Sequence, residues 1–311
     1  MKKQMILLSL CVMAAALPLP ANIFYFATTG NDSNPCTVGQ PCKSFRAAAV
    51  SSVASGDTIL ALDGVDFNLQ QLAAGAFPQS VTIDGGQHGA FMTGANGAAG
   101  LYLNAGSGAP IWVLRNLIIT VGANGSIPPQ GIFLNLPGGS LTMDNVTIIS
   151  QNVQGAAISG TVSNGGAVHM NGVTIVGAGS GIYLNNGTPS GGPFPFTAEN
   201  LVVDVTGPGV QIIDGYGTIR NSKFRSGASG TTGVALTTSS TTPSWLFDTC
   251  SFENLGYGLV IGGGETVRIS NSEFSGNGTG IFNSGTAISF RNNVFAGNST
   301  DGAPSLTTSL K

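Results

Sequence analysis

Charged residues are scarce in this 311-residue chain, where Asp, Glu, Lys and Arg together make up 8%. The net charge of −3 is close to neutral, and no basic run or basic–aromatic patch occurs, so nucleic acid is not an expected partner. The only two histidines, His88 and His169, are far apart with no third ligand near either, which argues against a metal site. With 42% apolar residues the chain can bury a large core, which excludes the composition of a disordered protein.

Long apolar runs are also lacking after the N-terminus. Lys2 and Lys3 precede an apolar stretch over positions 5–17, which Pro18 and Pro20 follow. The stretch is short for a membrane span and has the order of a secretory signal peptide. We therefore expect a signal peptide over 1–21, a secreted protein (extracellular or periplasmic), and no membrane span in the mature chain.

Cysteine is rare, with four residues, one of them (Cys11) inside the signal segment. Cys36 and Cys42 are six positions apart in a loop rich in Gly and Pro. In an oxidising compartment such a pair is expected to close as a disulfide. A pair of metal ligands is the alternative, but no second pair stands nearby. Cys250 is left over, and we expect it to be a buried, inert thiol.

An internal repeat of 21 to 29 residues organises the rest of the chain. Apolar residues recur four and two positions before, and three positions after, a column of mostly Asn: Asn116, Asn145, Gly172, Asn200, Asn221, Thr249, Asn271 and Asn292. Period-two alternation predicts strands with one buried face, and Asn tolerates the left-handed backbone of a bend between them. We expect these Asn side chains to point inward and to form a ladder of amides.

A further short strand beginning with Gly precedes each of these segments, as in Gly100-Leu101-Tyr102-Leu103 and Gly131-Ile132-Phe133-Leu134. Winding the chain so that each strand pairs in parallel with its copy in the next turn buries every apolar column. The predicted fold is all-β, a single-stranded right-handed parallel β-helix of about nine coils. A β-propeller or a β-sandwich would need antiparallel hairpins. A propeller would also need a longer period, so neither fold fits the repeat.

The repeat and its flanks divide the chain into four parts. We expect the signal peptide over 1–21, an N-terminal cap over 22–56 that carries the disulfide loop and a short helix over Ser44–Val53, the β-helix over 57–295, and a tail over 296–311. The cap is expected because a solenoid's open end needs a cover.

The segments Gly30–Cys36, Pro41–Phe45, Gly56–Ile59 and Val81–Gly85, together with the coils, resemble small secreted bacterial β-helix proteins of the pectin-lyase-like superfamily. The resemblance covers nearly the whole mature chain. That superfamily includes pectate and pectin lyases, polygalacturonases, epimerases, adhesins and phage tailspikes, so the fold alone does not choose a function.

The resemblance implies that chemistry would take place on the outer face of the strand that begins with Gly. A uronide lyase needs acidic residues there to hold calcium and an Arg or Lys base, and a glycosidase needs two or three Asp. The outward column predicted here is uncharged: Tyr102, Phe133, Ala157, Tyr183, Gln211, Ala235, Val260 and Phe282. We therefore expect no catalytic residue on this face and no cofactor, with calcium needed only if the chain is a lyase.

The same column holds the candidate ligand-binding residues, namely Tyr102, Phe133, Tyr183, Gln211 and Phe282. A row of exposed aromatic rings can stack on sugar rings. The alternative is that aromatic side chains merely stabilise the face of a sheet. Asp214 is the nearest acid beyond this strand and a weak catalytic candidate, although Asp214-Gly215 is also typical of a turn.

Charges that do occur gather in the column just before the Asn column, with Arg115, Asp144, Glu199, Arg220 and Asp248. Opposite signs on neighbouring coils predict ion pairs on an outer face rather than an active site. The sequence thus favours a secreted, non-catalytic β-helix that binds a polysaccharide or cell-surface glycan or serves as a scaffold. The alternative is a polysaccharide lyase or related carbohydrate-active enzyme on acidic polysaccharide.

Overall fold

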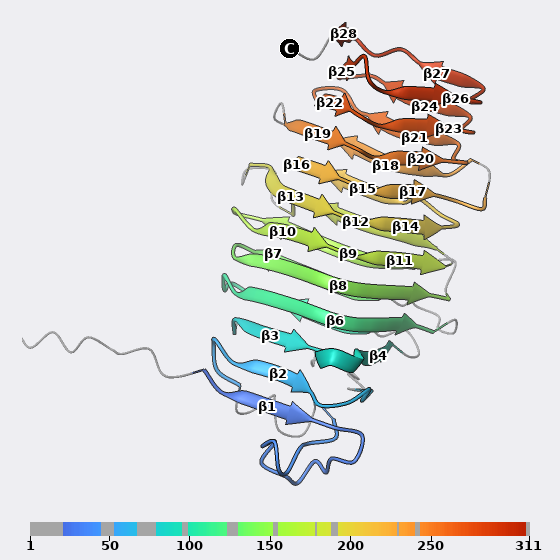
Figure 1. Ribbon diagram of the computed structural model, residues 1–311. Coiled ribbons are helices and arrows are strands. Elements are labelled where there is room, and N and C mark those ends of the chain that lie inside the picture. Colours follow the sequence, from blue (N-terminus) through green and yellow to red (C-terminus); the bar gives the residue numbers. More distant parts are fainter. Residues whose placement is uncertain are drawn as a thin grey trace, which may run out of the picture.

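The computed structural model describes residues 21–44, 53–66, 79–94, 99–122, 130–151, 155–177, 179–187, 192–228, 230–239 and 243–308. Parallel strands stack along one axis into a solenoid (Figure 1). A single 3-10 turn, η1 (Gly86–His88), is the one helical element among these residues. The predicted signal peptide, except Ala21, and most of the predicted helix over Ser44–Val53 lie outside the described residues.

One side of the solenoid is a parallel sheet of nine strands. Eight of them are the strands that the sequence marks with an initial Gly, and the ninth, β27 (Thr300–Gly302), follows them in the chain. The eight are β5 (Leu101–Asn104), β7 (Ile132–Pro137), β9 (Ala156–Ser163), β12 (Ser180–Asn185), β15 (Val210–Ile213), β18 (Thr232–Thr237), β21 (Tyr257–Ile261) and β24 (Thr279–Asn283).

The remaining 19 strands form a second parallel sheet that is bent along its length. Before the bend lie β1 (Ile23–Phe26), β2 (Thr58–Ala61), β3 (Val81–Asp84), β6 (Ile111–Val121), β8 (Ser140–Ser150), β10 (Ala167–Asn171), β13 (Phe194–Glu199), β16 (Gly215–Arg220), β19 (Ser244–Asp248), β22 (Thr266–Ser270), β25 (Thr286–Phe290) and β28 (Leu306–Thr308). After it lie β4 (Ala90–Gly94), β11 (Thr174–Gly177), β14 (Val202–Val205), β17 (Lys223–Arg225), β20 (Ser251–Glu253), β23 (Glu273–Ser275) and β26 (Val294–Ala296), while β6 and β8 run through the bend.

The core between the two sheets is built from the predicted apolar columns. Identical positions stack from coil to coil, and the rings of Phe224, Phe252, Phe274 and Phe295 form one such stack with centroid distances of 5.1, 4.6 and 5.0 Å. Cys250 is buried, as expected from its inward column. Burial of these columns is what makes the solenoid stable, because the hydrophobic effect scales with apolar area removed from water.

The bend falls at the predicted Asn column. Residues there have left-handed backbone, with φ of 54° at Asn116, 52° at Asn145, 54° at Asn200, 47° at Asn221 and 49° at Asn271. The prediction that these side chains point inward is wrong, because they are half-buried or exposed on the outside of the bend. The left-handed backbone turns the side chain away from the core. The amides still bond from coil to coil on the surface, as Asn145 Nδ2 does to Asn116 Oδ1 at 2.9 Å, and Asn292 Nδ2 to Asn271 Oδ1.

Two register predictions are wrong. In β9 the residue that lies beside Phe133 and Tyr183 is Ser159, not Ala157, which is buried. The strand is shifted by two residues from the expected alignment with β7. Ala157, and not Gly155, occupies the inward position that Gly131 holds one coil earlier. In the last coil Val267 pairs with Ala287, so Ile288 and Phe290 face outward.

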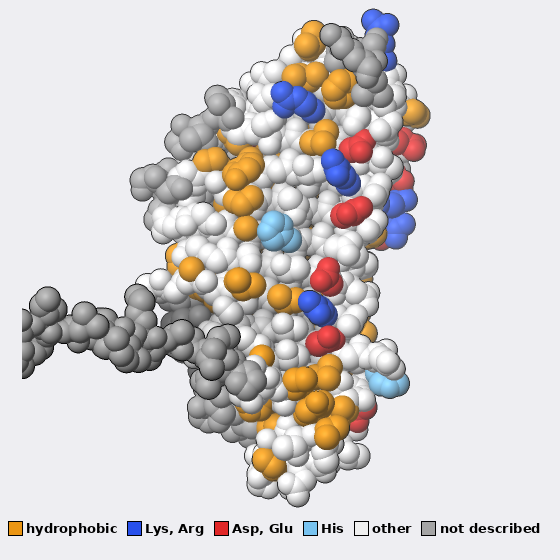
Figure 2. Space-filling model, turned by 60° about the vertical axis from the view of Figure 1, so that its left-hand side comes forward, with side chains coloured by type: hydrophobic (Ala, Val, Ile, Leu, Met, Phe, Trp, Pro, Cys, Tyr) orange, Lys and Arg blue, Asp and Glu red, His pale blue; other side chains and the backbone are white. Residues whose placement is uncertain are grey.

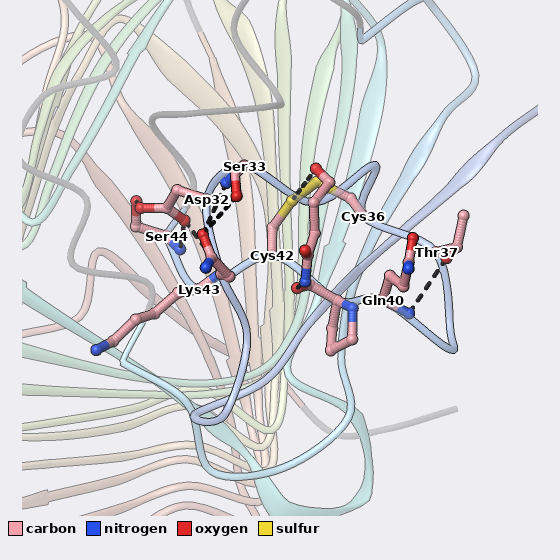
Figure 3. Close-up of a disulfide and its surroundings, with 11 residues drawn as sticks. Asp32, Ser33, Cys36, Thr37, Gln40, Cys42, Lys43 and Ser44 are labelled. Atoms are coloured by element: carbon pink, nitrogen blue, oxygen red, sulfur yellow. Dashed lines mark hydrogen bonds between the residues drawn. A yellow bond between two sulfur atoms is a disulfide. The ribbon is translucent and has the colours of Figure 1, made fainter.

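The N-terminal end is closed by the Cys36–Cys42 disulfide loop, as predicted (Figure 3). The loop lies against the free edge of β1, with Cys42 N donating to Tyr25 O at 3.0 Å and Tyr25 N donating to Cys36 O at 2.8 Å. The Asp32 carboxylate holds the loop's end by accepting bonds from Ser44 N and Oγ. The edge of the sheet is thereby covered, which natural β proteins need in order to avoid pairing with other chains.

Strand pairing extends beyond the expected β-helix range of 57–295. At one end β1 pairs in parallel with β2, and at the other β27 pairs with β24 and β28 with β25. The coil geometry therefore includes part of the expected cap and part of the expected tail.

Candidate functional site

The outer face of the nine-stranded sheet, called here the nine-strand face, holds the predicted aromatic row. Tyr102 and Phe133 lie on neighbouring strands β5 and β7, and their rings stack in parallel at a centroid distance of 4.7 Å and an interplanar angle of 6°. Both side chains are half-buried. The ring faces that meet are not available to a ligand, so a sugar ring could stack only on the face of Phe133 that is turned away from Tyr102, toward β9.

A hollow of about 450 Å³ continues from Phe133 toward β12. Its floor is Ser159, which stands between Phe133 on one neighbouring strand and Tyr183 on the other. Strands in a sheet are ~4.8 Å apart, so the strands that carry the two rings are ~9.6 Å apart, with a small side chain between them. Gly160, which also lines the hollow, lets β9 approach β7 closely, since a Cβ there would collide with the backbone of Leu134. We call this feature the Ser159 hollow.

Thr161 lines the hollow and belongs to a row of amides and hydroxyls that runs beside it, which the sequence reasoning missed. Asn135 Nδ2 donates to Asn104 Oδ1 at 2.8 Å, and Thr161 Oγ1 donates to Asn135 Oδ1 at 3.0 Å. These residues are outward and lie two positions after the aromatic row, on the same face. The spacing of Asn104 and Asn135 relative to the initial Gly was the signal that could have revealed this row.

Unpaired polar groups complete the hollow. Gln211 and Asn185 line it, and neither side chain makes a hydrogen bond to any described residue. Both are partly exposed, so they can donate to and accept from a ligand. The structure thus brings together Phe133, Tyr183 and Gln211 from the predicted set, with Tyr102 stacked alongside.

Phe282, the remaining predicted binding residue, lies apart from the hollow. It is 48% exposed on β24 and meets Tyr257 of β21 edge to face, with ring centroids 5.7 Å apart. Tyr257 is 41% exposed and was not predicted as a site residue. The nine-strand face therefore carries two aromatic pairs, Tyr102–Phe133 and Tyr257–Phe282.

Asp214 holds a turn. Its carboxylate is buried and accepts bonds from Thr238 Oγ1, Ser239 N and Ser239 Oγ at 2.6 to 2.9 Å. Burial acts to raise the pKa of Asp214, but these hydrogen bonds outweigh it and hold the pKa below its ordinary value. Its backbone is left-handed, with φ of 58°, as in the turn that the sequence also suggested. The carboxylate is fully used in joining two coils and is not presented to a ligand.

The charged column lies on the other sheet, before the bend (Figure 2). Arg115 and Asp144 approach to 3.8 Å, as predicted, but among the described residues Arg220 forms no salt bridge with Glu199 or Asp248. A second hollow, of roughly 400 Å³, lies here and is lined by His169, Asp144, Glu199 and Arg220. His169 Nδ1 bonds Thr197 Oγ1 at 2.8 Å, and no group of three or more potential metal ligands occurs among the described residues.

Glu265 is a buried acid that sequence reasoning did not identify. It follows β21, is 1% exposed, and neither carboxyl oxygen has a well-aligned hydrogen-bond partner among the described residues. Burial raises the pKa of Glu265 to about 8, which outweighs the opposite effect of the nearby Trp245 indole. No described hollow opens onto it, so it is a core residue rather than part of the nine-strand face.

Comparison with known proteins agrees with this architecture. The family model described as the right-handed β-helix region matches residues 188–307. A GH136 lacto-N-biosidase from Eubacterium ramulus superposes with a TM-score of 0.57, at 13% identity over 93% of this chain and 67% of its own. Pectate lyase Pel9A superposes with a TM-score of 0.59, at 16% identity over 94% of this chain and 80% of its own. No curated protein matches the sequence.

At these identities the likeness establishes the fold and leaves the chemistry to the residues of this chain. None of the described residues forms a helix with the length and apolar character that a membrane span requires.

Proposed function

The chain has the right-handed parallel β-helix fold of the pectin-lyase-like superfamily, and on this premise we propose that it is an exported protein that binds a polysaccharide on its nine-strand face without cleaving it. The observation that carries the proposal is the Tyr102–Phe133 stack continuing into the Ser159 hollow. Flat rings beside unpaired amides match the two surfaces of a sugar ring, one made of C–H groups and one of hydroxyls.

Export is supported by the disulfide between Cys36 and Cys42, because such bonds persist in oxidising compartments. The absence of cleavage is supported by the chemistry of the face. Glycoside hydrolysis needs a pair of carboxylates, and lyase chemistry needs a base next to the sugar's acidic proton. Among the described strands β5 to β24 of this sheet, no outward residue is acidic or basic.

Replacement of both rings tests the binding site. Tyr102→Ala with Phe133→Ala is expected to weaken retention on an insoluble polysaccharide at least about tenfold, since buried aromatic anchors carry a large share of binding energy. Tyr216→Ala is the control, because Tyr216 is an exposed aromatic residue on the 19-stranded sheet, away from the nine-strand face. Retention that is unchanged in the double variant, or equally reduced in the control, would overturn the assignment of the site.

Cleavage is tested separately, by incubating the chain with pectic, alginate and glycosaminoglycan polymers with calcium and with chelator. We expect no release of reducing ends and no unsaturated products. Turnover of any polymer would contradict the non-catalytic part of the proposal, while leaving the binding face to be tested on its own.

A further inference from the structure

Charge is partitioned between the two sheets of the solenoid. Every strand of the nine-stranded sheet from β5 to β24 lacks Asp, Glu, Lys, Arg and His, and only the terminal strand β27 carries a charge, Asp301. The 19-stranded sheet holds the remaining strand-borne charges near its surface, including the ion pairs Arg115–Asp144, Lys223–Glu253 and Arg225–Asp204. The nine-stranded sheet from β5 to β24 is therefore uncharged, although the other sheet of the same protein carries many charged side chains.

The connections next to this sheet follow the same rule in the sequence. Positions 123–129, 152–154, 188–191 and 240–242, which precede or follow its strands in the chain, contain no Asp, Glu, Lys, Arg or His. The two acids that do neighbour the sheet in sequence, Asp214 and Glu265, are buried. No group from these parts of the chain is available to neutralise a charged ligand.

An acidic polysaccharide would lose hydration at its carboxylates on such a surface and gain no counter-charge, which is costly. A neutral one would lose nothing comparable, and its hydroxyls could bond to Asn185, Gln211 and the Asn104–Asn135 row while its rings stack on the aromatic side chains. Building on the proposed function, we infer that the ligand is a neutral polysaccharide that lies along the helix axis, bound without calcium.

The direction follows from the position of the two aromatic pairs. Six strand-to-strand steps separate β7, which carries Phe133, from β24, which carries Phe282. At ~4.8 Å a step, the two pairs lie ~29 Å apart along the axis. An extended chain can reach both, and the second contact then forms at high effective concentration. A short oligosaccharide reaches only one.

The charge class is tested by retention of the full chain on β-1,3-glucan, β-1,4-mannan, β-1,4-xylan and β-1,4-galactan, compared with polygalacturonate and alginate. A highly methyl-esterified homogalacturonan and the same polymer after saponification form a pair with one backbone, in which neutral methyl esters are replaced by carboxylates. We expect at least one neutral polymer to be retained more than tenfold better than both acidic ones, and the esterified polymer to be retained better than its saponified form. Retention should be unchanged by chelator and by raising NaCl from about 0.05 to 0.5 M, since no ion pair is involved.

Strongest retention on polygalacturonate or alginate, equal retention of the esterified pair, or a requirement for calcium would overturn this inference and leave the proposed binding function intact. Retention on none of the polymers would instead overturn the proposed function itself.

For the axial direction, Tyr257→Ala with Phe282→Ala should weaken binding of the long neutral polymer at least tenfold and leave binding of its disaccharide at the Ser159 hollow unchanged. Equal binding of the long polymer by this variant would overturn the axial arrangement.

Discussion

At the scale of single residues, the acids of this chain show how burial and hydrogen bonding set opposite pKa directions. Asp214 and Glu265 are both nearly inaccessible. Asp214 accepts three hydrogen bonds, and its pKa is lowered, whereas Glu265 has no well-aligned partner, and its pKa is raised to about 8. Both the deeper burial of Glu265 and its lack of partners contribute to the difference.

Glu265 makes stability depend on pH. Its folded-state pKa lies above the ordinary value, so folding carries no penalty from this group below about pH 4.5. The penalty grows by about 1.4 kcal/mol per pH unit as pH rises toward 8 and is constant above that. Glu265→Gln, which cannot ionise, is therefore expected to be increasingly more stable than the natural chain from pH 5 to pH 8, as measured by urea unfolding at each pH.

Exposed Glu273 provides the control. Glu273→Gln should not give this stabilisation at pH 8, because the carboxylate that it removes is exposed to water. The prediction would be contradicted if the unfolding free energies of the natural chain and of Glu265→Gln differed by the same amount at pH 5 and at pH 8. That result would show that Glu265 is ionised in the folded state throughout this range.

At the scale of elements, the bend between β13 and β14 depends on one residue. Asn200 has a φ of 54°, and its Nδ2 donates to Asn171 Oδ1 at 3.1 Å. An alanine in this backbone conformation lowers the free energy of unfolding by roughly 1–2 kcal/mol, because its Cβ is strained there, and glycine has no Cβ. Asn200→Ala is therefore expected to lower the unfolding free energy by about 1–3 kcal/mol, and Asn200→Gly by less, in urea titrations. An equal loss in both variants would mean that the amide bond, not the backbone, is what Asn200 provides.

Element boundaries show where pattern reasoning succeeded and where it failed. The column of Asn and its flanking apolar positions predicted the bend and the inward residues of β6, β8, β13 and β22 correctly. The Asn column failed at β25 and the initial-Gly pattern failed at β9, because at both places the spacing changes by one or two residues and the apolar pattern fits more than one register. At β25 a small residue, Ala287, fills the inward position that Ile288 was expected to fill. The sequence cannot distinguish a bulge from a turn at β9 and β25, because both are compatible with the local alternation of apolar and polar residues.

At the scale of the whole molecule, the N-terminal end is the exposed edge that must be covered. The Cys36–Cys42 loop occupies the free side of β1 through bonds that include Ala27 N to Cys42 O at 3.0 Å. Replacing both cysteines by Ser is expected to cost about 2 kcal/mol and to promote association through the uncovered strand edge. Thermal unfolding and light scattering after size exclusion measure the two effects.

The natural chain treated with a thiol reductant should reproduce both effects, and a Cys250→Ala variant, which leaves the disulfide intact, should keep the oligomeric state of the untreated natural chain. A double-Ser variant with the same oligomeric state and the same stability as the natural chain would show that the loop stays on the edge of β1 without its covalent bond.

The sequence by itself determined the parallel β-helix, the disulfide loop and the aromatic row, because each rests on a local pattern repeated from coil to coil. Only the tertiary structure decided what that row can do. Ser159 entered the column between Phe133 and Tyr183 through a register that no local pattern specifies, and this opened the hollow. The pairing of Tyr257 with Phe282 and the coil-to-coil bond of Asn104 with Asn135 likewise join residues more than 20 positions apart. Such contacts depend on how coils stack, and stacking is fixed by the packing of the whole core rather than by any one repeat.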